Sequence, residues 1–158
     1  LPVKPSPNLP NMKAVYLYPA TCYFEATPVS LGRGTSLPFQ VYGHPNMTGY
    51  DYSFTPKSVP GAKNPPQLNK LCHGVNLSNM SDEEIWKRGV DLSYVIDAYK
   101  NLNIGDHFFR PFFELLVGTD YVRKMIIEGK SAEEIKNRWK GDVEKFKEQR
   151  KPYLLYQE

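Results

Sequence analysis

The pattern of hydrophobic and polar residues divides the chain into two unlike halves near residue 80. In the first half, residues 37–42, 50–59 and 71–77 read as strands. The clearest evidence is the alternation of aromatic and polar residues from Tyr50 to Thr55, because a period of two is typical of a half-buried strand. Twelve of the fourteen prolines lie in this half, so we expect short strands joined by irregular links.

Helical periodicity replaces this pattern in the second half of the chain. Two capping boxes, Ser81 with Glu84 and Ser131 with Glu134, indicate where helices begin. Another helix is expected to start at Thr119 or Asp120, with Tyr121, Val122, Met125 and Ile126 facing inward and Gly129 ending it. The helix after Ser131 is predicted to be the longest, with one apolar face formed by Ile135, Trp139, Val143 and Phe146.

These patterns predict an α+β fold in which about three helices from the second half pack on a small sheet of short, proline-flanked strands. A chain of 158 residues with 41% hydrophobic residues suits one domain, spanning 1–158. We also expect a short helix with Pro19 in its first turn that runs through Glu25. Gly74 is expected at a bulge or a close approach of two strands. Residues 153–156 are predicted to form a closing strand.

Composition excludes several classes of function. The net charge is +3 and the charges of both signs are interleaved in the second half, which argues against nucleic-acid binding. No run of residues is apolar enough to span a membrane, and no glycine-rich cofactor fingerprint is present, so no cofactor is predicted. Two cysteines and three histidines without a C-x-x-C pair argue against a metal site. Cys22 and Cys72 are compatible with one disulfide or with two buried free thiols.

The candidate chemistry lies between Tyr18 and Thr35. Glu25 is one of two carboxylates in the first eighty residues, and it follows three largely apolar residues. Arg33 lies between Gly32 and Gly34, which allow a tight, exposed backbone that presents its guanidinium group. Glu25 and Arg33 could pair with each other and fix the loop, or both could face a polar ligand. From the residues alone, the structural ion pair is the commoner case.

The same stretch carries a family resemblance. The segment YPATCYFEATPVSLGRGT, followed by a Pro-Phe pair, resembles the signature that opens the C-terminal domain of NamZ-type exo-β-N-acetylmuramidases. Three further motifs fit in the same order: residues 5–8, 71–75 and 150–156. The chain departs from the family pattern at Ala26 and His73, where glycine is expected.

The resemblance implies hydrolytic release of N-acetylmuramic acid from the non-reducing ends of peptidoglycan fragments in bacterial cell wall recycling. It implies that a Rossmann-like N-terminal domain, absent from this chain, supplies the main catalytic acid. This chain would close the cleft from the other side and would be inactive alone. Its partners would be muramyl saccharides and that N-terminal domain. The implied location is the periplasm or the extracellular space, with the cytoplasm as the alternative.

The site residues follow from the same resemblance. Arg33 is the expected partner of the lactyl carboxylate of muramic acid, and Glu25 is expected to orient Arg33 or bind a sugar hydroxyl. The full set of expected substrate-binding residues is Asn8, Tyr18, Glu25, Arg33, Thr35 and His73. The catalytic residue stays unassigned in this chain, with Glu25 in a supporting role. The alternatives are a glycan-binding module that uses Tyr18, Tyr23 and Arg33, and a purely structural domain.

Overall fold

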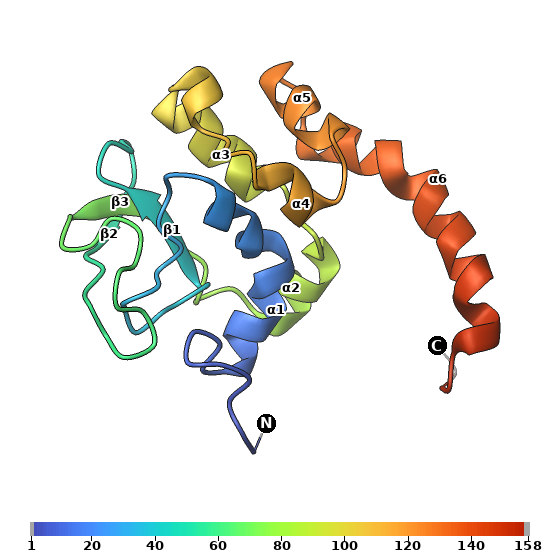
Figure 1. Cartoon of the computed structure of the whole chain (residues 1–158), viewed down its shortest axis with the longest axis horizontal. Helices are drawn as coiled ribbons and strands as arrows, with labels where there is room; N and C mark the ends of the chain where they lie inside the picture. The colour runs from blue at the N-terminus through green and yellow to red at the C-terminus, as the bar shows by residue number, and fades with distance from the viewer. Residues whose placement is uncertain (1, 157–158) are drawn as a thin grey trace.

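Three short strands form a small antiparallel sheet that lies beside a larger group of helices (Figure 1). The computed structural model describes residues 2–156. The strands are β1 (Val41–His44), β2 (Tyr52–Phe54) and β3 (Cys72–Asn76). Their order in space is β1-β3-β2, so the last strand in the sequence is the central one. The predicted α+β class is confirmed, with the strands in the first half and most helices after them.

The two longer strands approach each other closely where two glycines pair. Gly43 of β1 lies opposite Gly74 of β3. A Cβ atom on Gly74 would lie 1.9 Å from the carbonyl oxygen of Tyr42 and 2.6 Å from the Cα atom of Gly43. A side chain at this position would therefore overlap the backbone of β1. The close approach predicted for Gly74 is confirmed.

β1 begins later than the predicted strand at residues 37–42. The backbone N–H of Gln40 donates to the carbonyl of Leu37 at 3.1 Å, which closes a turn. Phe39 within that turn has a φ of +59°, which a strand residue does not adopt. The strand can start only after the turn, at Val41.

β2 is shorter than the predicted strand at residues 50–59. It ends at Phe54, and Pro56 then removes a backbone donor from the chain. Lys57 next donates its backbone N–H to the carbonyl of Gly34 at 2.9 Å instead of pairing with β3. The segment predicted to extend the sheet therefore supports the turn that contains Arg33.

The first helix differs from its prediction. α1 (Met12–Thr21) begins with Asn11 as its cap, whose side chain accepts a backbone N–H at 2.9 Å. Pro19 lies in the last turn of this helix and not in its first, so the predicted position of Pro19 is wrong. The missing donor costs one hydrogen bond close to the end, where the helix soon stops. The 3-10 helix η1 (Cys22–Ala26) follows directly and carries Glu25.

The first helical region of the second half is divided in two. α2 (Asp82–Arg88) ends at Gly89, whose φ of +59° breaks the helix, and α3 (Ser93–Leu102) follows. The side chain of Ser81 accepts the N–H of Glu84 at 3.1 Å, as predicted. The carboxylate of Glu84 pairs with an arginine one turn later at 3.1 Å, so we find only this half of the capping box.

A short 3-10 helix, η2 (Gly105–His107), leads into α4 (Phe113–Val117) and then α5 (Tyr121–Ile127). The four residues predicted to face inward on α5 all pack against the core, and two of them, Val122 and Ile126, are fully buried. Gly129 follows with a φ of +82°, which stops the helix where predicted.

The last helix, α6 (Ala132–Arg150), runs away from the rest of the molecule (Figure 1). Its predicted capping box at Ser131 is complete. Ile135 is buried, but the same apolar face then leaves the body, and the side chains of Val143 and Phe146 are 42% and 59% exposed. A short 3-10 helix, η3 (Lys151–Tyr153), takes the place of the predicted closing strand. The helix is about 28 Å long at its usual rise, so its end lies far from the sheet that such a strand would join.

One aromatic core joins the sheet to the helices. The ring of Phe24 stacks on Tyr42 with centroids 4.8 Å apart, which links η1 to β1. At the end of η1, the carbonyl of Ala26 accepts the backbone N–H of Arg110, which lies just before α4, at 2.9 Å. Glu25, within η1, is therefore held between the sheet and the α4 region. Within residues 2–156, we find no helix that combines the length and apolar content needed to cross a membrane.

Candidate functional site

Glu25 and Arg33 lie together on the surface. Glu25 Oε1 and Arg33 Nη1 are 3.5 Å apart, and about a quarter to a third of each side chain is exposed. The two residues come from different elements, since Glu25 belongs to η1 and Arg33 to the following turn. The structure thus brings together the two residues that the sequence singled out.

Two glycines shape the turn that presents Arg33. Gly32 and Gly34 have φ values of +79° and +82°, which favour glycine. A Cβ atom on Gly32 would also lie 2.5 Å from the carbonyl oxygen of Leu37. The hydroxyl of Thr35 donates to the Gly32 carbonyl at 2.7 Å and accepts the Leu37 N–H at 3.0 Å. Thr35 therefore stabilises the turn, and its hydroxyl is already engaged on both sides.

The guanidinium group of Arg33 does not use all of its hydrogen-bond donors within the described residues. Its Nε is buried and has no hydrogen-bond partner among the described residues. Its distance of 3.5 Å to Glu25 exceeds the 2.7–2.9 Å typical of a charge-assisted hydrogen bond. About a third of the Arg33 side chain is exposed, so an anionic ligand can reach this loosely paired guanidinium group.

Tyr18 and Cys22 lie close enough to Glu25 for its charge to act on both. Burial and the Glu25 charge raise the pKa of the Tyr18 hydroxyl. Burial and then Glu25 raise the pKa of the Cys22 thiol to about 11. The ring of Tyr18 packs against Phe39 with centroids 5.0 Å apart and is 38% exposed. The site therefore joins one carboxylate and one guanidinium to a neutral phenol and a neutral thiol.

We expect Cys22 to react slowly with iodoacetamide near neutral pH. A thiol with a pKa of about 11 holds about one hundredfold less thiolate at pH 7.5 than a thiol with a pKa of 9.0. The alkylation rate should rise about tenfold per pH unit up to about pH 11. Mass spectrometry on a Cys72→Ala variant would measure this rate, with the urea-unfolded chain as the control. A rate that levels off above pH 9 would contradict the expectation.

Two predicted site residues lie in other surroundings. The side-chain amide of Asn8 donates to the carbonyl of Gly61 at 2.9 Å, which fastens the entry segment to a loop. His73 lies in the central strand, opposite His44 of β1 and Ser53 of β2. In the described part of the chain, neither residue has a hydrogen bond or ion pair with Glu25 or Arg33.

A second polar cluster was not predicted from the sequence. Tyr42 and Tyr50 both donate their hydroxyls to Asp97 Oδ2 at 2.8 Å. Burial, then Asp97, raises the pKa of both tyrosines. The signal in the sequence is a single carboxylate between Ile96 and Ala98, on an otherwise apolar stretch of helix. This cluster joins α3 to β1 and to the loop before β2.

Two cavities lie away from the Glu25–Arg33 pair. One of about 400 Å³ is lined by residues of α6, including Trp139, Val143 and Phe146, together with Tyr121. Another, of about 470 Å³, lies beside α4 and is lined by Glu114 and by neighbouring residues. Neither Glu25 nor Arg33 lines either of these two cavities.

Within residues 2–156 we find neither a disulfide nor a cluster of metal-binding residues. Both cysteines are free, with Cys72 buried and Cys22 half-buried. This result selects two free thiols over the disulfide. No group of three or more His, Cys, Asp or Glu residues in the described part of the chain could hold a metal ion.

Comparison with known proteins identifies the family. The model described as "Exo-beta-N-acetylmuramidase NamZ, C-terminal" matches residues 16–156. The chain belongs to this family. The resemblance inferred from the Tyr18–Thr35 signature is therefore confirmed. Among curated proteins, "Peptidoglycan beta-N-acetylmuramidase NamZ" of Bacillus subtilis (strain 168) is 34% identical over 169 residues, covering 98% of this chain and 40% of that protein.

Two solved structures match this NamZ C-terminal chain. A DUF1343 family protein from Bacteroides fragilis NCTC 9343 is 82% identical, with a TM-score of 0.99 over all of this chain and 45% of its own. A second DUF1343 family protein of the same organism shares the fold, with a TM-score of 0.68 at 19% identity over 98% of this chain and 45% of its own. This NamZ C-terminal chain spans less than half the length of each relative.

Proposed function

We propose that this chain is part of an exo-β-N-acetylmuramidase that releases N-acetylmuramic acid from the non-reducing ends of peptidoglycan fragments. Membership of the NamZ C-terminal family supports a glycoside hydrolase. In this proposal, a Rossmann-like N-terminal domain supplies the main catalytic acid and this chain supplies the opposite wall of the cleft. The protein would act on cell-wall material in recycling, in the periplasm or outside the cell.

The observation that carries the proposal is the exposed and loosely paired guanidinium group of Arg33. Its Nε is buried without a hydrogen bond, while Glu25 lies 3.5 Å from Nη1. Muramic acid differs from glucosamine in its lactyl carboxylate. A planar guanidinium group binds a carboxylate through two parallel hydrogen bonds. Arg33 is thus suited to recognise the group that distinguishes this substrate.

Glu25 has a supporting role in this proposal. Its carboxylate lies 3.5 Å from Nη1, and about a third of the Arg33 side chain stays exposed to a ligand. Cleavage of a glycosidic bond commonly uses two carboxyl groups on opposite sides of the bond. The described site has one carboxylate near Arg33, which is why a second wall is needed. Glu25 would hold Arg33 in position and accept a hydrogen bond from a sugar hydroxyl.

The alternative functions have weaker support. A glycan-binding surface would need exposed rings, but Tyr23 packs toward Phe113 with centroids 6.4 Å apart and is half-buried. Tyr18 is the one tyrosine of that surface with a substantially exposed ring. A purely structural ion pair agrees with the contact of Glu25 and Arg33, but it leaves the buried Nε of Arg33 without a function.

The test is hydrolysis of a chromogenic β-N-acetylmuramide. We expect no activity from residues 1–158 alone and activity when the N-terminal domain is restored. Activity of the isolated chain would overturn the shared cleft and make Glu25 the leading catalytic acid. Absence of activity in both proteins, with both folded by circular dichroism, would favour the glycan-binding alternative.

A further inference from the structure

The C-terminal arm of the molecule exposes an apolar surface that the rest of the described residues, 2–138, do not cover. We define the arm as residues 139–156, the outer part of α6 and the segment after it. Six of its large apolar residues are at least 40% exposed: Val143, Phe146, Tyr153, Leu154, Leu155 and Tyr156. Exposed apolar residues gathered on one element indicate a binding surface more often than scattered ones do.

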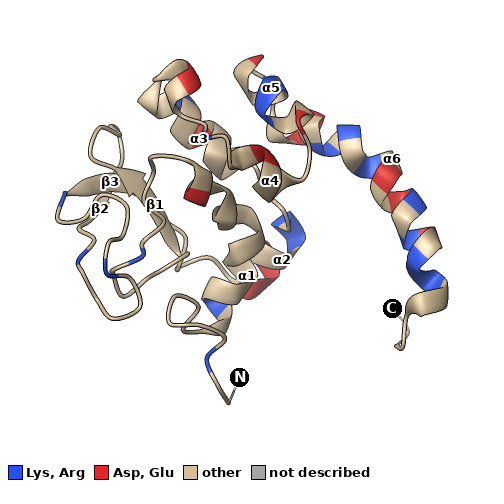
Figure 2. Ribbon diagram, in the orientation of Figure 1, with Lys and Arg blue, Asp and Glu red and all other residues tan. Residues whose placement is uncertain are grey.

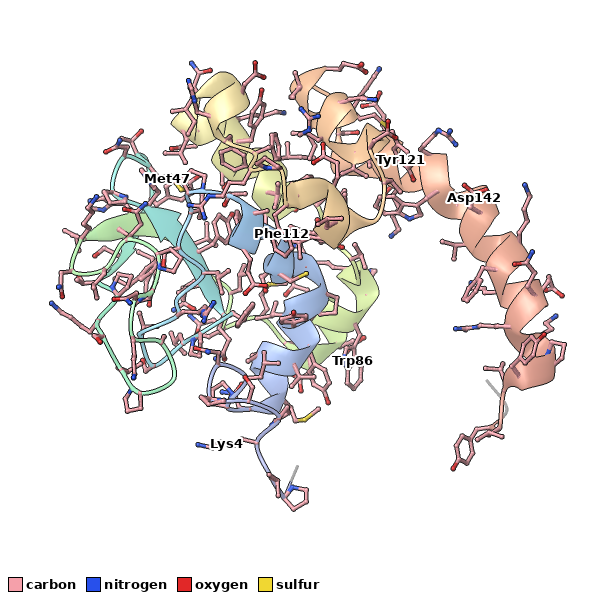
Figure 3. All side chains as sticks on the ribbon, viewed as in Figure 1. Lys4, Met47, Trp86, Phe112, Tyr121 and Asp142 are labelled. Carbon is pink, nitrogen blue, oxygen red and sulfur yellow. The ribbon has the colours of Figure 1, made fainter. Side chains whose placement is uncertain are left out.

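The exposed residues continue the face of α6 that is buried at its start. Ile135 is fully buried and Trp139 packs against the core. Val143 and Phe146 follow at helical spacing and belong to no core cluster of the described chain. Figure 3 shows Asp142 on the part of α6 that stands clear of the sheet and the other helices. The apolar face of the helix thus begins in the core, and within residues 2–156 its outer part belongs to no core cluster.

The apolar face of the arm is also hollowed. The cavity of about 400 Å³ between Tyr121 and α6 is lined mainly by apolar atoms of Trp139, Val143 and Phe146. Figure 2 shows that Lys, Arg, Asp and Glu are mixed along α6, so no surface of one sign competes with the apolar face. The hollow and the apolar lining of this face both suit contact with an apolar surface of another protein segment.

The comparisons indicate what covers this face. The 82% identical Bacteroides fragilis structure superposes on all of this chain with a TM-score of 0.99, so its arm follows nearly the same path. That protein has more than twice the length matched here. An arm that keeps this course in a longer protein has additional chain available to pack against it. The family match is to a C-terminal region, which places the additional chain before the arm.

From these observations we propose that the apolar face of the arm docks onto the N-terminal domain of the same polypeptide. Residues Val143 and Phe146 lie at the centre of this contact. The arm thereby fixes the N-terminal domain relative to the domain described here, at a surface separate from the Glu25–Arg33 site. The inference does not depend on which glycan the protein cleaves.

Trypsin cleavage within the arm tests the proposal, because α6 contains many lysines. We expect cleavage after Lys140, Lys145 and Lys147 to be at least about tenfold slower in the two-domain protein than in residues 1–158 alone. Phe146→Asp should abolish this protection, because a carboxylate in an apolar contact is costly to bury. In the 158-residue chain the same substitution should leave the melting temperature unchanged, since Phe146 packs on nothing in the core.

Lys145→Gln is the matched control. It changes the net charge by the same amount as Phe146→Asp, and the Lys145 side chain is 80% exposed. It should preserve the protection at the remaining sites. Equal cleavage of the arm in the long and short proteins would overturn the proposal. A concentration-dependent dimer of the short chain that Phe146→Asp dissociates, without protection in the long protein, would assign the surface to a second copy instead.

Discussion

Replacing Gly74 with alanine is expected to destabilise the fold by about 4 kcal/mol or more, one of the largest effects of a single substitution. The added Cβ would meet the carbonyl oxygen of Tyr42 at 1.9 Å and the Cα of Gly43 at 2.6 Å. Both contacts are with backbone, so no side chain can move aside. β1 and β3 must separate and lose the hydrogen bonds of the central strand. Urea unfolding followed by circular dichroism would measure the change.

Gly141→Ala is the control for this experiment. Gly141 lies within α6, and a Cβ atom there would have nothing within 4 Å. Alanine in an exposed helix interior is more favourable than glycine by up to about 1 kcal/mol. We therefore expect Gly141→Ala to raise the free energy of unfolding and Gly74→Ala to lower it. An unfolding midpoint for Gly74→Ala equal to that of the parent chain would show that the strands can separate without loss.

The second large effect is expected at Arg33. In the two-domain protein, Arg33→Ala should lower kcat/KM for a β-N-acetylmuramide about one hundredfold, equivalent to about 3 kcal/mol of lost binding to the lactyl carboxylate. Arg33→Lys should recover part of this loss, because it keeps the charge but not the planar fork. The measurement is steady-state hydrolysis of the chromogenic substrate by the parent and both variants.

Two controls separate recognition from a structural role of Arg33. With the lactyl group as its methyl ester, Arg33→Ala should change kcat/KM by less than about threefold, because the anion is gone. Lys57→Ala removes a nearby cation whose ammonium group lies 3.3 Å from Asn69, and it should have little effect on either substrate. Equal losses on the acid and the ester would mean that Arg33 only holds the turn.

Features set by neighbouring residues were predicted well from the sequence. The capping box at Ser131 forms because its three-residue spacing fixes the geometry wherever the helix lies. Gly129 ends α5 and Gly74 marks the close strand approach, because glycine is the residue that these backbones need. The pairing of Glu25 with Arg33 also followed from local cues, a carboxylate with few competitors and a cation on a glycine turn.

Features that depend on distant segments were missed. Pro19 was expected at a helix start, but α1 begins seven residues earlier, where Asn11 provides the cap. Asp97 is a single carboxylate on an apolar stretch of helix, but no neighbouring residue indicated that two tyrosine hydroxyls from the other half would bind it. The apolar residues of α6 recur with the same helical period whether another segment covers them or they are exposed to solvent. Its periodicity therefore could not show that Phe146 would be exposed.

The strand order has a consequence for how the chain folds. β3, the last strand to be synthesised, lies between β1 and β2, which are not hydrogen-bonded to each other. No two-stranded intermediate can form until residues 72–76 are available, so the sheet is completed in one late, non-local step. Helices close local contacts and form quickly, whereas pairing over tens of residues is slow. Folding of the half that bears Arg33 is therefore expected to set the overall rate.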